Sequence, residues 1–201
     1  MRLIAAGASP FVRKVRVVLA ETEQEGDVHV DFTKVTPVSV NDDLNAANPL
    51  GKIPALVRED GPAIYDSRVI CRYLNDRALG ALYPKAREWE VLTLEATGDA
   101  IMEAAVAMVY ERHVRPEDEQ SDTWVEAQWT KIDRTLDALE AKWMSHLSGP
   151  LDISHISIGC ALGYIDFRLG DRNWRKGRAG LAAWEAGFLE RPSMQATIPS
   201  D

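Results

Sequence analysis

The pattern of apolar residues changes character between the two parts of this chain. Short apolar stretches alternate with helical patterns over residues 2–78, whereas residues 87–201 carry helical patterns and no strand signals. Apolar periodicity is the main sequence signal that separates strands from helices. The chain therefore has to combine a small α/β unit, 1–78, with an all-helical bundle, 87–201, and we expect residues 79–86 to be a linker.

The first part predicts, in order, a strand, a helix, a strand, a short and poorly formed helix, two strands and a helix. We expect these elements at residues 2–6, 9–22, 28–32, 41–47, 54–57, 63–65 and 67–77. The first strand, helix and strand form a β-α-β unit, which favours a parallel pair with a right-handed crossover. The turn residues at 58–62 predict that the last two strands form an antiparallel hairpin.

The second part predicts four helices. They cover residues 87–115, with a possible bend at Gly98, then 121–147, 153–169 and 180–189. With 201 residues, 46% of them apolar, the chain is long enough to bury a core across both parts.

Composition excludes some function classes. A net charge of −8, with 31 acidic against 23 basic residues, argues against binding nucleic acid through phosphate neutralisation. Cys71 and Cys160 lie inside helical patterns and suggest no disulfide framework, which fits a reducing, cytoplasmic compartment. No leader pattern opens the sequence and no segment approaches the roughly 20 apolar residues of a membrane helix, so we expect no membrane partner.

Three short motifs in the first part have the chemistry of a binding site. In ASPF, residues 8–11, Ser9 is a helix N-cap with Pro10 at the first helical position. In NPLGKIPAL, residues 48–56, a cis Ile53-Pro54 bond would fix the turn and leave the Ile53 backbone free to pair with an extended peptide. In YDS, residues 65–67, a helix begins where backbone N–H groups and a hydroxyl suit a carboxylate.

ASPF, NPLGKIPAL and YDS, in this order and spacing, resemble the cytosolic glutathione transferase superfamily, and most closely its bacterial serine-type members. The resemblance extends over nearly the whole chain. It implies a thioredoxin-like N-terminal domain that binds glutathione, followed by a helical domain that contributes the pocket for an electrophile. It also implies a homodimer.

The resemblance assigns a role to each motif residue. Ser9 would donate a hydrogen bond to the glutathione sulfur, and Phe11 would lie beside the tripeptide. Ile53 and Pro54 would pair with its cysteinyl part, and Lys52 would reach its glycine carboxylate. Asp66 would hold the γ-glutamyl ammonium and Ser67 the carboxylate. Structural roles remain open beside these, because Ser9 and Asp66 are ordinary helix caps and an exposed lysine is usually only solvated.

Other residues are expected at the edges of this site. The electrophile pocket that the resemblance implies would lie between the Ser9 turn and the helix 87–115, which makes Phe11, Met108, Tyr110 and Arg112 candidates for its wall. Met and aromatic residues at helical spacing are, however, usually core. Asp99 resembles an acid that some relatives extend across the dimer interface towards the partner's glutathione.

The histidines also bear on the prediction. Asp152 and His155 fall where the family begins its buried helix with a capping box. Because His155 replaces the usual acid, reciprocal capping stays open. His29, His113, His146 and His155 show no ligand spacing, so we expect no metal.

These features predict a detoxifying glutathione S-transferase that ionises the thiol of glutathione and conjugates it to a small electrophile. One alternative is glutathione-dependent reduction of disulfides or peroxides on the same fold. Another is a dimeric interaction module without catalysis.

Overall fold

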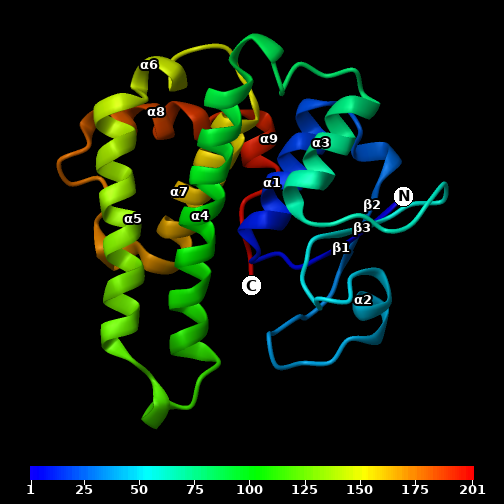
Figure 1. Ribbon diagram of the computed structural model, residues 1–201, viewed down its shortest axis with the longest axis horizontal. Coiled ribbons are helices and arrows are strands. Elements are labelled where there is room, and N and C mark those ends of the chain that lie inside the picture. The colour runs from blue at the N-terminus through cyan, green and yellow to red at the C-terminus, as the bar shows by residue number, and fades with distance from the viewer.

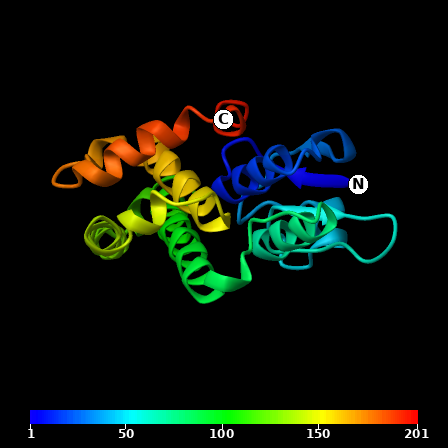
Figure 2. The same cartoon turned by 90° about the horizontal axis from the view of Figure 1, so that it is seen from above.

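The computed structural model describes residues 1–201 and places a small sheet with its helices on one side and a helical bundle on the other (Figures 1 and 2). The first part contains β1 (Arg2–Ala5), α1 (Pro10–Glu21), β2 (His29–Phe32), α2 (Asp42–Ala47), β3 (Ala55–Val57) and α3 (Ser67–Arg77). The second contains α4 (Glu88–His113), α5 (Asp122–Lys142), α6 (Met144–Leu147), α7 (Ile153–Leu169), α8 (Ala179–Leu189) and α9 (Pro192–Gln195).

The sheet has three strands in the order β2-β1-β3. The expected parallel pairing of β1 with β2 is confirmed, with Leu3 opposite Val30. The hairpin prediction was wrong in its second strand, because only an isolated bridge between Leu56 and Ile64 forms there. Strand β3 instead pairs antiparallel with β1. Only Tyr65 separates Ile64 from Asp66, the residue that caps α3, so the chain has no room for a longer ladder.

The prediction of one continuous helix over 121–147 was also wrong. Helix α5 ends at Lys142, and Trp143, with φ −118° and ψ 0°, separates it from the short α6. The helical spacing of apolar residues in the sequence continues through this break. The reason is that the partly buried Trp143 packs against the same core as Leu136 and Leu139 of α5. Periodicity reports which face is buried and could not locate the turn.

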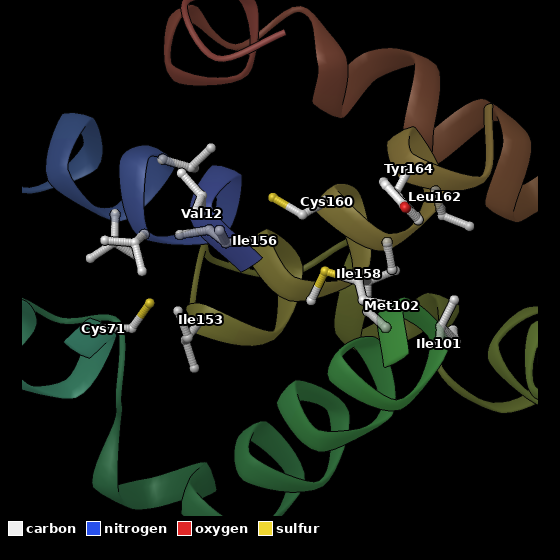
Figure 3. Close-up of a cluster of buried hydrophobic side chains, with 14 of the residues drawn as sticks. Val12, Cys71, Ile101, Met102, Ile153, Ile156, Ile158, Cys160, Leu162 and Tyr164 are labelled. Atoms are coloured by element: carbon white, nitrogen blue, oxygen red, sulfur yellow. The ribbon is translucent and has the colours of Figure 1, made fainter. Parts of the chain in front are cut away.

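Helix α7 lies at the centre of the molecule. Every residue from Ile153 to Leu162 is buried, the polar Ser154, His155 and Ser157 included, so this stretch of the helix has no face towards solvent. Figure 3 shows side chains from α1, α3 and α4, among them Val12, Cys71 and Met102, gathered around it. The main core of 37 buried residues therefore runs through both parts of the chain and ties them together.

Gly98 allows α4 to approach α7 closely. A Cβ built there would lie 2.4 Å from Ser157 Oγ and 2.7 Å from the Ser157 carbonyl carbon. We expect Gly98→Ala to lower the free energy of unfolding by about 1–3 kcal/mol, measured by urea denaturation. Gly187→Ala on α8 is the matched control, because a Cβ there meets nothing within 4 Å and alanine favours helix by about 0.5–1 kcal/mol. Equal effects of the two substitutions would contradict this explanation.

Candidate active site

Ser9 ends the turn between β1 and α1. Its Oγ accepts a hydrogen bond of 3.3 Å from the Val12 N–H, so Ser9 is the N-cap of α1. The side chain is partly exposed, and its own proton has no acceptor within the chain. A hydroxyl that can still donate, at the positive end of a helix dipole, can stabilise a thiolate placed beside it.

The segment before β3 presents unpaired backbone. The Ile53-Pro54 peptide bond is cis. Asn48, which is buried, shapes the turn by donating from Nδ2 to the Lys52 carbonyl at 2.7 Å. The N–H and C=O of Ile53 have no hydrogen-bond partner within the chain, and the exposed Lys52 side chain has none either. An extended peptide can therefore add to this edge through its own backbone.

Asp66 and Ser67 begin α3. Asp66 is the N-cap, and its Oδ1 accepts a hydrogen bond of 3.0 Å from the Arg68 N–H. Ser67, only 3% exposed, is the first residue of the helix. The free N–H groups of a first helical turn, together with the Ser67 hydroxyl, suit a carboxylate, while the exposed Asp66 suits an ammonium.

Asp99 lies in a buried charge network rather than at the surface. Lys14 Nζ donates to Asp99 Oδ1 and Oδ2 at 2.8 and 3.0 Å and lies 2.8 Å from Glu95 Oε1. Ser157 Oγ is 3.0 Å from Asp99 Oδ1, and Arg68 Nε is 3.4 Å from Asp99 Oδ2. Both carboxylate oxygens are thus engaged within the chain, and a contact from Asp99 to a partner's ligand would have to compete with these bonds.

The same network connects the helices that begin at the candidate site. Lys14 belongs to α1 and Arg68 to α3, and both contact Asp99 on α4. Burial disfavours the Lys14 ammonium, but Asp99 and Glu95 outweigh this and raise its pKa. Lys14 is therefore a permanent cation with a fully buried side chain, and it holds the start of the helical part against α1.

The candidate pocket residues are placed differently from one another. Tyr110 is 42% exposed, whereas Met108 is 1% exposed and belongs to the main core. Arg112 pairs with Asp122 at the start of α5. Phe11 is partly buried against the core. Phe11 lies on α1 and the other three on α4, and of these three Met108 has almost no surface available to a ligand.

Sequence reasoning missed the segment that follows α9. Ser200 returns to the Ser9 turn, where its N–H lies 3.5 Å from the Gly7 carbonyl oxygen and its own oxygen would lie 2.8 Å from a Cβ on Gly7. The neighbouring Asp201 pairs with Arg168 of α7. Figure 1 shows this end of the chain beside the start of α1. No local pattern could reveal the contact, because nearly the whole sequence separates the two segments.

The capping box of α7 is reciprocal despite its histidine. Asp152 Oδ1 accepts from the Ser154 N–H at 3.0 Å, and the Asp152 N–H donates to His155 Nδ1 at 3.3 Å. His146 Nε2 lies 3.1 Å from Asp152 Oδ2. The potential ligand atoms of His146, Asp152 and His155 lie within 4.8 Å of one another. Hydrogen bonds already occupy them, and Arg87 stands 3.4 Å from Asp152, so their present role is to cap the helix.

We expect His146 to make stability depend on pH. Burial lowers the pKa of His146, so the folded chain binds its proton less readily than the unfolded chain does. The resulting stabilisation is complete above the unfolded pKa of about 6.5 and is lost as the pH falls below that value. The difference in free energy of unfolding between the wild type and His146→Gln should therefore shrink between pH 7 and pH 5. A constant difference over this range would contradict the assignment.

Asp152 adds a second pH dependence at lower pH. Burial alone would raise the pKa of Asp152, but the interactions of its carboxylate with His155 and Ser154 outweigh burial and lower the pKa to about 2. Its contribution to stability is complete above about pH 4 and is lost as the pH falls towards 2. The two dependences occupy separate pH ranges, so denaturation curves can resolve them.

Comparison with known proteins agrees with the fold. A family model for the glutathione S-transferase N-terminal domain matches residues 8–77, and one for the C-terminal domain matches residues 122–187. A glutathione transferase family member from Pseudomonas fluorescens Pf-5, solved with bound glutathione, has 43% identity and a TM-score of 0.96, covering 100% of this chain and 99% of that chain.

Two further relatives extend the comparison. A Pseudomonas fluorescens Pf-5 family member with bound S-(propanoic acid)-glutathione has 42% identity, a TM-score of 0.92 and full coverage of both chains. The uncharacterized GST-like protein YibF of Escherichia coli K12 is 31% identical, over 99% of this chain and 98% of its own length.

A thioredoxin-like unit followed by a helical domain is the architecture that the two family models describe. The chain belongs to the glutathione S-transferase family. No helix in the structure combines the length and the high hydropathy of a membrane-spanning segment.

Proposed function

We propose that this chain is a serine-type glutathione transferase that binds glutathione, ionises its thiol beside Ser9 and conjugates it to a small electrophile. One observation carries the proposal. Ser9 keeps a hydroxyl proton free to donate at the N-terminus of α1, and the unpaired Ile53 backbone stands just before β3, the strand that pairs with β1. The glutathione-bound relative at 43% identity supports the same ligand here.

The motif residues would divide the binding of the tripeptide among them. The Ile53 backbone would pair with the cysteinyl part, and Pro54 would hold that turn. Lys52 has no partner within the chain and would take the glycine carboxylate. Ser67 would bind the γ-glutamyl carboxylate and Asp66 its ammonium, while Phe11 would contact the tripeptide beside Ser9. The proposed boundaries are those of the sequence analysis, with glutathione held by residues 1–78 and the electrophile by residues 87–201.

Catalysis would follow from thiolate stabilisation and proximity. A free thiol has a pKa of about 8.5, so lowering this value by one to two units makes the thiolate abundant at neutral pH. The sulfur then attacks an electrophilic carbon held nearby, either adding to a double bond or displacing a leaving group. The exposed Tyr110 is the predicted α4 residue best placed to meet such a substrate, whereas Arg112 is engaged with Asp122 and would act only indirectly.

A reductase is the second candidate function. The residue at the thiol position is a serine, which cannot form a mixed disulfide with glutathione, and this favours conjugation. Reduction with two glutathione molecules would still be compatible with a serine. A non-catalytic module is the third, and the unpaired Ile53 backbone and free Lys52 argue against it.

A homodimer is the proposed assembly. The outer face of α4 carries an open groove and the side chain of Trp89, which is 76% exposed. The groove is lined by Leu92, Thr93, Ala96, Thr97, Ala100 and Thr135. Small residues beside an exposed tryptophan suit close packing against a second helix pair. We place the enzyme in the cytoplasm, because both cysteines are free and buried.

Calorimetric titration with glutathione, followed by parallel assays, tests the proposal. We expect binding at micromolar to millimolar concentrations, faster turnover with an aromatic halide than with a disulfide or peroxide, and a dimer in sedimentation. Binding with reductase activity alone would establish the second candidate. If the protein does not bind glutathione at millimolar concentrations, the non-catalytic interaction module becomes the preferred function.

A further inference from the structure

Glu185 is a buried carboxyl group in the helical part that the proposed mechanism does not use. It lies on α8 and is only 1% exposed. Its Oε2 accepts a hydrogen bond of 2.8 Å from Arg175 Nη2, but its Oε1 has no hydrogen-bond partner within the chain. A charged oxygen that is buried without a donor is costly, and a proton on the carboxyl group removes that cost. The surroundings of Glu185 therefore favour its neutral form.

Arg175, the partner of Glu185, is already occupied by a second carboxylate. It belongs to the segment 170–178 between α7 and α8, and its Nη1 and Nη2 donate to Asp166 of α7 at 2.7 and 2.6 Å. Trp174, in the same segment, donates from Nε1 to Asp166 Oδ1 at 2.8 Å. One guanidinium neutralises one carboxylate, so an ionised Glu185 would be an excess negative charge at this place.

Arg175 is the only cation that pairs with Glu185. Burial raises the pKa of Glu185 and Asp166 raises it further, whereas Arg175 lowers it. The other titratable groups near α8 are engaged elsewhere: Glu140 of α5 with the N–H groups of Gly180 and Leu181, His146 of α6 and His155 of α7 with Asp152, Arg178 with Asp133 and Asp137, and Arg191 with Glu21. Asp166 and Arg175 are therefore the charged groups that decide how Glu185 titrates.

We propose that Glu185 and Asp166 form a carboxyl–carboxylate pair that shares one proton, and that loss of this proton releases the segment 170–178 from α8. With the proton in place, Arg175 can hold both groups. Once the proton passes to solvent, two carboxylates compete for one guanidinium, and Glu185 has almost no access to water. Arg175 has a side chain that is 42% exposed, so it is the member that can move outward.

This inference goes beyond the proposed function and does not depend on it. The segment 170–178 lies at the edge of the helical part that faces away from the sheet (Figures 1 and 2). Residues Ser9, Ile53 and Ser67 all belong to the other part of the chain. Opening of the segment can therefore be measured on the full chain without glutathione.

Glu185→Gln tests the shared proton, because an amide has the size and charge of the neutral carboxyl group. The folded wild type binds this proton more tightly than the unfolded chain does, so its stabilisation is complete below the unfolded pKa of about 4.3 and is lost as the pH rises. The ratio of the unfolding constants, wild type over Glu185→Gln, should therefore rise above about pH 4.5 and then level off. Urea denaturation at several pH values measures both constants.

Tryptic cleavage after Lys176 tests the release of the segment. Lys176 is exposed and lies within 170–178, so its cleavage rate follows the population of the open segment. At pH 8 the wild type should be cleaved there roughly threefold or more faster than Glu185→Gln. Cleavage after the exposed Lys34, in the loop that follows β2, is the internal reference and should be equal in the two proteins.

Glu126→Gln is the matched control. Glu126 also pairs with an arginine, Arg172, but its side chain is 58% exposed. Its ratio of unfolding constants should stay flat above about pH 5, and cleavage after Lys176 should not change. The inference is overturned if the ratio for Glu185→Gln is equally flat, or if this variant is less stable than the wild type at every pH. A rising ratio with equal cleavage after Lys176 would overturn the release of the segment.

Discussion

Replacing Ser9 by alanine is expected to raise the pKa of the bound glutathione thiol by about one to two units. The substitution removes the hydroxyl whose proton is free to donate, while the helix dipole of α1 stays in place. At neutral pH the thiolate fraction, and with it kcat/KM, should fall roughly ten- to hundredfold. A titration of thiolate ultraviolet absorbance in the enzyme–glutathione complex measures the pKa directly. An unchanged pKa would assign thiol activation to backbone N–H groups.

A second serine separates this effect from the loss of a helix cap. Ser9→Ala also removes the hydrogen bond to the Val12 N–H, which costs about 1 kcal/mol of stability. Ser121 caps α5 in the same way, accepting from the Trp124 N–H at 3.2 Å. Ser121→Ala should therefore lower stability by a similar amount without changing the thiol pKa. Ser9→Thr, which keeps a hydroxyl, should retain most of the activation.

Replacing Lys14 by methionine is expected to lower the free energy of unfolding by about 3–5 kcal/mol. The substitution keeps an unbranched side chain but removes the ammonium. The carboxylates of Glu95 and Asp99 are then buried without the cation that neutralises them. Arg68 still reaches Asp99, at 3.4 Å, so Glu95 loses most. Urea denaturation at fixed protein concentration measures the change.

Two further variants define the cause. Lys14→Met combined with Glu95→Gln removes both members of the buried pair, so it should be more stable than Lys14→Met alone. Lys85→Met is the exposed control, because Lys85 is 79% exposed and pairs with Glu88 at 3.2 Å. It should change stability by less than about 1 kcal/mol. A double variant that is no better than Lys14→Met would show that packing, and not the unpaired charge, is responsible.

Much of the fold could be predicted from local patterns. The N-cap and proline at the start of α1, the parallel β1–β2 pair and the ranges of α3 and α7 are as expected, because short-range hydrogen bonding and apolar spacing decide them. The second hairpin strand and the continuous helix over 121–147 were wrong, since apolar spacing reports burial and does not locate the chain's turns. The reciprocal cap by His155 stayed open until the ring position was known.

The residues of the candidate site also fall into two groups, those that local sequence patterns indicate and those that depend on tertiary packing. Ser9, Ile53 and the pair Asp66 and Ser67 could be named from sequence, because each stands at the start of a helix or strand and local geometry fixes what its backbone can bind. Burial of Met108 and the contacts of Asp99 could not be named, since both depend on which helix packs against α4.

The sequence by itself determined the family and the order of most elements, and it singled out the three short motifs that we propose to bind glutathione. Those features depend on residues that are close together along the chain, so local sequence patterns can reveal them. Only the tertiary structure decided that buried Asp99 contacts both the buried Lys14 and the exposed Arg68, and that Ser200 returns to the Ser9 turn. Packing around α7 creates these contacts between distant segments, and their chemistry appears only when the segments meet.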